Sequence, residues 1–273
     1  MKKFCFFLIL TTGSFVSNAQ ELYPYTEPAS NMPTGTLSTK ITATNGRHFS
    51  DRLQKYVPEV MFGISKKTMV HIAGSFSNMH TKNVEWDGIY TYVKYRFLSK
   101  DEVHSHFRMA AFAQASYSRH YLQYDEIDLN ADISGFQAGL IATQLKNKFA
   151  ASATVSFIKA IDNKRLHPEH FIKPNKAFNY SMSAGYLVLP REYKSFEQLN
   201  LNIYTELLGQ NIIGSKAYFF DAAPAVQLIF NSNSKLNLGF RFQLTGEGVR
   251  NTDQSFMLSF EHTFFNALRR SNQ

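Results

Sequence analysis

The feature that most constrains the fold is a strict two-residue alternation of apolar and polar side chains. It is clearest in residues 236–245, Leu-Asn-Leu-Gly-Phe-Arg-Phe-Gln-Leu-Thr, where every even position is large and apolar and every odd one is polar or glycine. A period of two indicates a β-strand with one apolar and one polar face. The apolar face packs in a core in a soluble sandwich and against lipid in a membrane barrel. Because the alternation recurs from about residue 35 to 265, we expect an all-β chain.

The N-terminus has the pattern of a secretory signal peptide. Two lysines precede a short apolar stretch, and Ser17-Asn18-Ala19 supplies the small residues of a cleavage site. We therefore expect residues 1–19 to be removed and the proline-rich residues 20–33 to form a periplasmic lead-in. The single cysteine, Cys5, lies in the segment to be removed, so we expect no disulfide in the mature chain.

Composition narrows the class of protein further. No later segment reaches eighteen consecutive apolar residues, so we expect no membrane helix. The mean hydropathy is −0.26 although 44% of residues are hydrophobic. Both a barrel with a polar lumen and an exported soluble β-protein would give this mixture. The formal net charge of +8 in an exported chain favours phosphorylated lipid headgroups over nucleic acid as a partner.

The lengths of the connections favour a barrel over a sandwich. We expect about twelve strands, within a range of ten to fourteen, in residues 34–265. Short connections fall near residues 66, 100, 147, 192 and 233, and longer ones near residues 50, 82, 126, 169, 212 and 250. Short turns at one rim and long loops at the other are typical of outer-membrane barrels. We therefore predict a single antiparallel transmembrane β-barrel with both termini periplasmic.

Several local expectations follow from turn and strand signals. Pro224 cannot donate to a β-ladder, so it predicts a bulge or kink in its strand. A three-residue turn at Ser65-Lys66-Lys67 would place Met61 opposite His71. We also expect a polar loop at residues 44–55 with a turn at Asn45-Gly46, a charged turn at residues 99–102, and longer polar loops at residues 119–132 and 162–176.

The chain resembles the outer-membrane β-barrel proteins of Gram-negative bacteria, and more closely a barrel group of the Bacteroidota placed among outer-membrane transporters and channels. The resemblance is carried by residues 27–33, Glu-Pro-Ala-Ser-Asn-Met-Pro, by Gly63-Ile64-Ser65-Lys66-Lys67, by Lys94-Tyr95-Arg96-Phe97 and by Phe264-Phe265. It implies a place in the cell outer membrane among lipids and lipopolysaccharide, and insertion by the barrel-insertion machinery. Barrels of this kind commonly end on an aromatic residue, whereas here residues 266–273 follow as a tail, so Phe264 or Phe265 would serve as the signal.

Strand parity predicts which charged side chains face the lumen. They are Lys40, Glu59, Lys94, Arg96, Arg108, Glu206, Asp221, Arg241 and Glu261. These charges could form a selectivity constriction, or they could form a structural ion-pair network that fills a narrow lumen. Their positions along the strands predict an acidic vestibule at the outer rim, formed by Glu59, Glu206 and Asp221. Lys94, Arg96 and Arg108 would then form a basic zone toward the periplasm.

Two other groups of residues raise specific chemistry. Met61, Met69 and His71 would face inward on neighbouring strands, and thioether with imidazole suits Cu(I), although methionine packing explains them as well. Ser118 and His120, with Asp125 nearby, could serve a lipid hydrolase, but nothing supplies an oxyanion hole. We therefore predict no metal site, no cofactor and no catalytic residue.

The basic residues of segment 162–176 could bind lipopolysaccharide phosphates or an anionic solute, or form an ordinary solvated loop. Taken together, the sequence predicts a narrow channel or passive transporter for small polar solutes. One alternative is a barrel that conducts nothing and serves as a structural or surface-binding protein. The other is a lipid-modifying hydrolase. A solvated path lined by Lys40, Lys94, Arg108 and Arg241 would favour the channel, and side chains interlocked across the lumen would favour the structural barrel.

Overall fold

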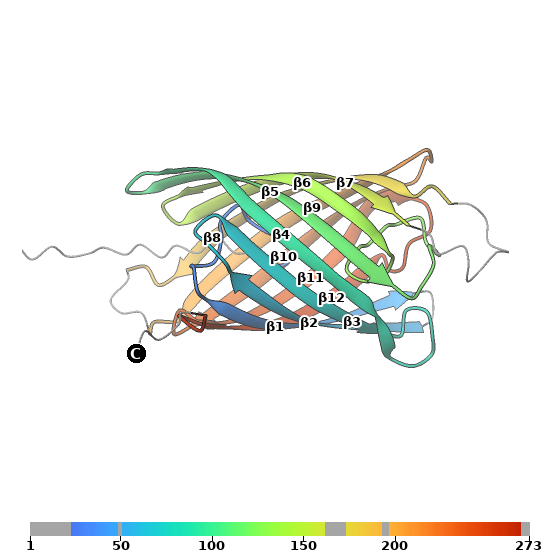
Figure 1. Cartoon of the computed structure of the whole chain (residues 1–273), viewed down its shortest axis with the longest axis horizontal. Helices are drawn as coiled ribbons and strands as arrows, with labels where there is room; N and C mark the ends of the chain where they lie inside the picture. The colour runs from blue at the N-terminus through green and yellow to red at the C-terminus, as the bar shows by residue number, and fades with distance from the viewer. Residues whose placement is uncertain (1–22, 49–50, 162–172, 193–196, 269–273) are drawn as a thin grey trace, which may run out of the picture.

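The computed structural model describes residues 23–48, 51–161, 173–192 and 197–268. These residues form twelve antiparallel strands that close into one barrel (Figure 1). The strands are β1 (Leu37–His48), β2 (Asp51–Gly63), β3 (Thr68–Ser77), β4 (Glu85–Asp101), β5 (Ser105–Ser118), β6 (Gly135–Lys146), β7 (Phe149–Ala160), β8 (Lys176–Leu189), β9 (Asn200–Ile213), β10 (Tyr218–Phe230), β11 (Ser234–Glu247) and β12 (Gln254–Phe264). The predicted all-β fold and strand number are confirmed.

The first and last strands close the sheet. β1 pairs with β12 from Leu37 opposite Phe264 to Gly46 opposite Ser255. A sheet closed in this way has no open edge, so it leaves no row of unpaired backbone groups for lipid to solvate. Among the residues that the structure describes, none belongs to a helix long and apolar enough to cross a membrane.

The outer face of the barrel is apolar and the inner face is polar. On β11, Leu238 and Phe240 are 39% and 42% exposed, whereas Lys235 and Asn237 are both 5% exposed. This is the inverse of a soluble domain, whose core is apolar and whose surface is polar. Exposed apolar side chains occur on strand after strand, among them Ile41, Ile72, Phe97, Tyr117, Leu140, Phe157, Met182, Ile203, Val226 and Leu258. The outer face is therefore suited to contact acyl chains.

The connections are sorted between the two rims only in part as predicted. We call the end that holds the β2–β3, β4–β5, β6–β7, β8–β9 and β10–β11 connections the turn rim, and the opposite end the loop rim (Figure 1). The loop rim carries the long β5–β6 connection, residues 119–134, and the long β7–β8 connection. However, residues 49–50 and 214–217 make two short connections at the same rim.

The expected loop at residues 44–55 is wrong, because both strands continue through it. Asn45 pairs with Gln54, and Gly46 pairs with Leu53. A Cβ on Gly46 would lie 2.9 Å from the hydroxyl oxygen of Thr252. The glycine therefore permits close approach of the β11–β12 connection and does not mark a turn.

The expected charged turn at residues 99–102 is also displaced. β4 continues to Asp101, which pairs with His106, after a bulge between Arg96 and Leu98. The bulge inserts one extra residue into β4. Pairing with β5 then continues to Asp101, and the chain turns at residues 102–104, beyond the predicted position.

Two predictions of strand register, one for the β2–β3 turn and one for β10, can be compared with the observed pairing. Met61 lies opposite His71, and the backbone N–H of Ile64 donates to the carbonyl of Thr68, so the three-residue turn between them is confirmed. The bulge in β10 lies between Phe220 and Asp221, not at Pro224. Pairing with β9 continues through Pro224, while pairing with β11 skips residues 223 and 224, where the proline has no N–H to donate.

The segment before β1 lies inside the barrel. We call residues 23–36 the inner segment. Its backbone receives hydrogen bonds from, or donates them to, inward side chains of three separate strands: Lys94 on β4, Thr143 on β6 and Glu206 on β9. The expectation of a periplasmic lead-in at residues 20–33 is therefore wrong from Tyr23 onward, because the described residues lie within the lumen. Its prolines keep it out of the sheet, and the polar wall satisfies its backbone instead. Residues 1–22 lie outside the described part of the chain.

The β5–β6 connection also lies inside the barrel, and we call residues 119–134 the inner loop. Its backbone at Ile127 exchanges two hydrogen bonds with the Gln210 amide of β9, and its Leu129 carbonyl accepts one from Gln114 of β5. Four apolar side chains of the loop pack against the wall in a buried cluster. The cluster includes Leu122, Ile127, Leu129 and Ile133 from the loop, with Ile158, Ile212 and Phe219 from the strands. The prediction of a polar loop here is wrong.

An arginine on the outer face should destabilise the barrel in a way that depends on lipid. Leu258 lies at the middle of β12 and is 42% exposed. We expect Leu258→Arg to lower the free energy of unfolding in lipid vesicles by about 2–4 kcal/mol, because the charge would lie near the bilayer midplane. Thr245→Arg near the loop rim should cost less than about 1 kcal/mol. Equal effects at the two positions in urea titrations would contradict a lipid-facing surface.

Candidate functional site in the barrel lumen

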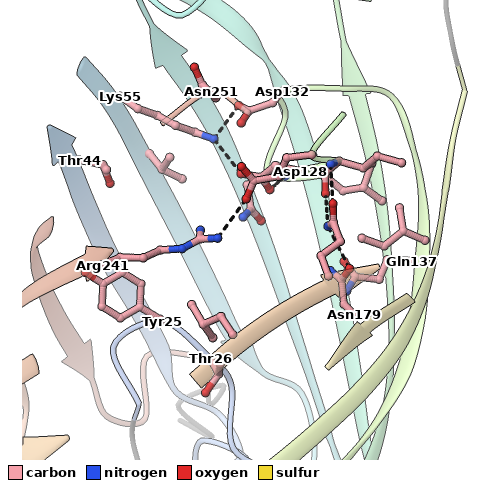
Figure 2. Close-up of a pocket in the computed structure, with 18 of the residues that line it drawn as sticks. Tyr25, Thr26, Thr44, Lys55, Asp128, Asp132, Gln137, Asn179, Arg241 and Asn251 are labelled. Atoms are coloured by element: carbon pink, nitrogen blue, oxygen red, sulfur yellow. Dashed lines mark hydrogen bonds and ion pairs between the residues drawn. The ribbon is translucent and has the colours of Figure 1, made fainter. Parts of the chain in front are cut away.

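The lumen contains a cavity of about 480 Å³ between the inner segment and the inner loop. Figure 2 shows side chains from three sources that line it: Tyr25 from the inner segment, Asp128 from the inner loop and Arg241 from β11. A separate cavity of about 180 Å³ lies toward the turn rim and is lined in part by Pro33 and Asn202. The inner segment contributes to both cavities, so it divides the lumen.

Glu206 anchors the inner segment. Its Oε1 accepts a hydrogen bond from the backbone N–H of Tyr25 at 2.8 Å, and its Oε2 accepts one from the Thr26 hydroxyl at 2.6 Å and one from Ser183 at 3.0 Å. The side chain is fully buried, and no cation pairs with it among the described residues. Glu206 therefore holds a polypeptide segment and does not act as part of a charge ring.

Lys94 and Arg108 anchor the same segment further along. The Lys94 ammonium is fully buried, donates to the Pro28 carbonyl at 2.6 Å and lies 3.1 Å from Glu27. Arg108 donates to the Ser30 hydroxyl at 2.8 Å and pairs with Asp101 at 2.8 Å. Both cations are thus neutralised by protein groups, and neither lines the larger cavity.

Four charges join the inner loop to the opposite wall. Arg250 contacts Glu126 of the inner loop at 2.8 Å and Asp221 of β10 at 2.7 Å. Arg241 contacts the same two carboxylates at 3.0 and 2.6 Å. Two positive and two negative groups therefore compensate one another. Because Asp221 is only 1% exposed, the loss of either arginine would leave a buried charge poorly paired.

A second charged group lies where the inner loop meets β2. The Lys55 ammonium is 2.6 Å from Asp132 and 3.5 Å from Asp128. Burial raises the pKa of Asp132 well above its usual value, although Lys55 opposes this. Burial acts in the same direction on Asp128, but Lys55 and the backbone N–H of Asn130 outweigh it and lower the pKa of that carboxyl. The Lys55 ammonium thus pairs with both carboxyl groups, closely with Asp132 and more distantly with Asp128.

Lys40, Glu59 and His71 form a third group on the first three strands. The Glu59 carboxylate lies 3.0 Å from the Lys40 ammonium and accepts a hydrogen bond from the His71 Nδ1 at 2.8 Å. Met61 and Met69 are both 5% exposed and pack beside them. No group of three His, Cys, Asp or Glu side chains within the described ranges could hold a metal ion. The contact with Glu59 uses the Nδ1 of His71, so that nitrogen is not free to bind a metal ion.

Near the turn rim, Glu261 pairs with Lys235 at 2.8 Å and accepts from Ser38 at 3.0 Å. Arg96 donates to the Lys66 carbonyl at 2.8 Å. Charges of opposite sign therefore meet within each part of the lumen. The separate acidic vestibule and basic zone that the strand positions suggested do not appear, since Asp221 at the loop end is matched by two arginines.

The sequence missed the charged residues that lie in connections or beyond the expected strand ends. They are Lys55, Glu126, Asp128, Asp132 and Arg250. Strand parity says nothing about a loop that turns back into the lumen. One signal was present: apolar residues alternate at 127, 129, 131 and 133 within a stretch taken as polar.

The residues considered for hydrolysis do not form the geometry that it requires. The Ser118 hydroxyl donates to the backbone carbonyls of Asp132 at 3.1 Å and Asp87 at 3.4 Å. The His120 Nε2 contacts the Asp87 carboxylate at 3.0 Å, and its ring stacks on His80. The Ser118 hydroxyl accepts a hydrogen bond from the His120 backbone N–H at 3.2 Å, but the ring nitrogen that would activate it contacts Asp87 instead, so this candidate has no activated nucleophile.

Most of the basic segment 162–176 lies outside the described residues. Of its described part, Lys173 pairs with Asp125 of the inner loop at 3.1 Å. This contact ties the β7–β8 connection to the inner loop. A role of this segment in binding lipopolysaccharide stays a prediction.

The sequence matches no protein-family model and no curated protein. Among solved structures, the fold is similar to that of an outer membrane channel from Pseudomonas putida F1, with 13% identity, a TM-score of 0.58 and coverage of 89% of this chain and 100% of that chain. It is also similar to the beta domain of the Bordetella autotransporter BrkA, with 10% identity, a TM-score of 0.51 and coverage of 84% and 99%. The chain therefore has the fold of an outer-membrane β-barrel.

The contacts between Glu126 and Arg250 should be energetically coupled. We expect a double-mutant cycle of Glu126→Gln and Arg250→Met to give a coupling energy of about 1–3 kcal/mol in unfolding titrations, because both groups are largely buried. The exposed pair Glu85–Arg119, at 3.2 Å, is the matched control and should give less than about 1 kcal/mol. Additive effects of the two lumenal substitutions would show that the network does not hold the inner loop.

The stacked histidines should give a pH-dependent contact at the loop rim. Burial, and next the neighbouring His120, lowers the pKa of His80 from 6.5 to about 4. The fold thus favours the neutral ring, so its contribution to stability is complete above pH 6.5 and is lost as the pH falls toward 4. We expect an NMR titration midpoint for His80 near 4, and a higher midpoint in His120→Ala. A midpoint near 6.5 in the unsubstituted protein would contradict the stacked arrangement.

Proposed function

We propose that this protein is an outer-membrane channel for small polar solutes, narrowed by the inner segment and the inner loop. The observation that carries the proposal is the polar cavity of about 480 Å³, enclosed by a closed barrel whose outer face is apolar. A barrel that served only as a membrane anchor would have no need of such a space. Paired charges on its walls would bias which solutes enter.

The proposal includes an orientation and a route of insertion. β1 begins and β12 ends at the turn rim, so both termini would be periplasmic and the loop rim would face outward among lipopolysaccharide. Phe264 or Phe265 would present the aromatic signal to the insertion machinery. Membership of the Bacteroidota barrel group rests on the sequence resemblance and is part of the proposal.

A specific observation favours a second candidate, a structural barrel that conducts nothing. The inner segment separates the larger cavity from the smaller one at the turn rim. In addition, the Gln227 amide bonds Asn202 and Asn237, and Asn237 bonds Ser259, so side chains interlock across neighbouring strands there. Conduction would then require the inner segment to shift.

Planar bilayers distinguish the two candidates. We expect the folded protein to give small conductance steps, and Glu206→Ala to increase them several-fold, because the inner segment loses its two hydrogen bonds to that carboxylate. Glu247→Ala, an exposed glutamate at the loop rim, is the matched control and should leave conductance unchanged. If folded protein and folded Glu206→Ala are both silent, the channel function is refuted and the structural barrel is favoured.

A further inference from the structure

The charges around the larger cavity have no positive surplus. Seven carboxyl groups line it or pair with the groups that line it: Glu27, Glu59, Glu126, Asp128, Asp132, Asp221 and Asp253. Only five lysines and arginines do so: Lys40, Lys55, Lys94, Arg241 and Arg250. With all of these groups ionised, seven negative and five positive charges leave a net charge of −2. The lining therefore disfavours an anion, although the whole chain has a formal charge of +8.

Every cation of this set is already held by a carboxylate, whereas Asp128 and Asp253, of the seven carboxylates, make no short ion pair within the described residues. Lys55 makes its short contact with Asp132, at 2.6 Å, and lies 3.5 Å from Asp128. The Asp128 side chain is 42% exposed, compared with 12% for Asp132 and 1% for Asp221. Figure 2 shows Asp128 among the lining side chains, between Lys55 and Arg241 on one side and Asn179 on the other.

Buried polar atoms along the same cavity lack protein partners. His71 and Tyr92 belong to the cavity lining, and the Nε2 of the first and the hydroxyl of the second are buried behind its surface with no hydrogen-bond partner in the described structure. Their side chains are 2% and 6% exposed, so each unmet group carries a desolvation penalty. A small shift of the side chains that cover them would open them to a hydroxyl group on a solute. They are a signal of a ligand that is independent of the charge balance.

Aromatic rings complete the lining. Tyr25, Tyr90, Tyr92 and Tyr124 all contribute to it. Tyrosine faces attract organic ammonium groups, and a cavity of this volume lies within the usual range for small-molecule sites. An anion, by contrast, would have to displace a carboxylate from an arginine or lysine that already holds it.

We infer that the larger cavity binds a small hydroxylated organic cation, with the ammonium group at the carboxylate of Asp128. This inference rests on the proposed channel function in that it names the class of solute the channel selects. The Lys55 ammonium keeps its 2.6 Å contact with Asp132 whether or not a solute takes the Asp128 carboxylate, although Asp128 also shares a hydrogen bond with Asp132. The solute thus finds a carboxylate already oriented by the Asn130 backbone N–H, at 2.9 Å.

The test compares two molecules of nearly the same shape that differ in charge. Choline carries a permanent positive charge, and 3,3-dimethylbutan-1-ol replaces its nitrogen with carbon. We expect calorimetry on the folded full chain in detergent to show choline binding at least about tenfold tighter. We expect Asp128→Asn to remove that preference and Glu247→Gln, an exposed charge-matched control outside the cavity, to retain it.

Equal affinity for the two molecules, or a choline preference that survives Asp128→Asn, would overturn the inference. So would the absence of choline binding to folded protein at concentrations up to 100-fold above the protein. Because the measurement is at equilibrium in detergent, it does not depend on conduction. If the protein conducts but shows no choline preference, the channel function stands and the cation site is refuted. If the barrel is silent but binds choline, the cation site stands and the channel function is refuted.

Discussion

Lipid offers no hydrogen-bond partner to a peptide group, and every other feature of this barrel depends on that constraint. The twelve strands satisfy one another only because β1 pairs with β12 along ten residue pairs. Closure then assigns the two faces of each strand, with large apolar side chains outside and polar ones inside. A one-residue slip of register would expose Lys235 and Asn237 to acyl chains and place Leu236 and Leu238 in the lumen.

The polar lumen creates a second requirement, because buried polar groups must find partners. The barrel meets it by drawing two segments inside. Glu206, Lys94 and Thr143 bond the backbone of the inner segment, and ion pairs hold the inner loop at Glu126 and Asp132. What is left open is a cavity whose walls are paired except at a few atoms. A bound solute would supply the missing hydrogen-bond and ionic partners of those atoms and of Asp128.

The sequence predicted the parts of the fold that period two governs. Alternation on β11 and the register of Met61 with His71 follow directly from the side chains. The errors fall where alternation is not the deciding signal. Asn45-Gly46 looks like a turn, yet its glycine serves close packing against Thr252, and the proline-rich residues after Tyr23 look solvated, yet the wall bonds their backbone. Charged partners such as Arg250 could not be found, because parity does not describe a loop that folds back inward.

The central claim is that the apolar side of the sheet faces lipid and the polar side faces a lumen. Nitroxide labels on single-cysteine variants from Leu236→Cys to Leu244→Cys, in vesicles, test it most directly by their accessibility to dissolved oxygen, which concentrates in lipid. The account predicts accessibility that alternates with a period of two and peaks at positions 236, 238, 240 and 242, on the outward face of β11. Accessibility that is uniformly low, or that peaks at positions 237, 239 and 241, would contradict it.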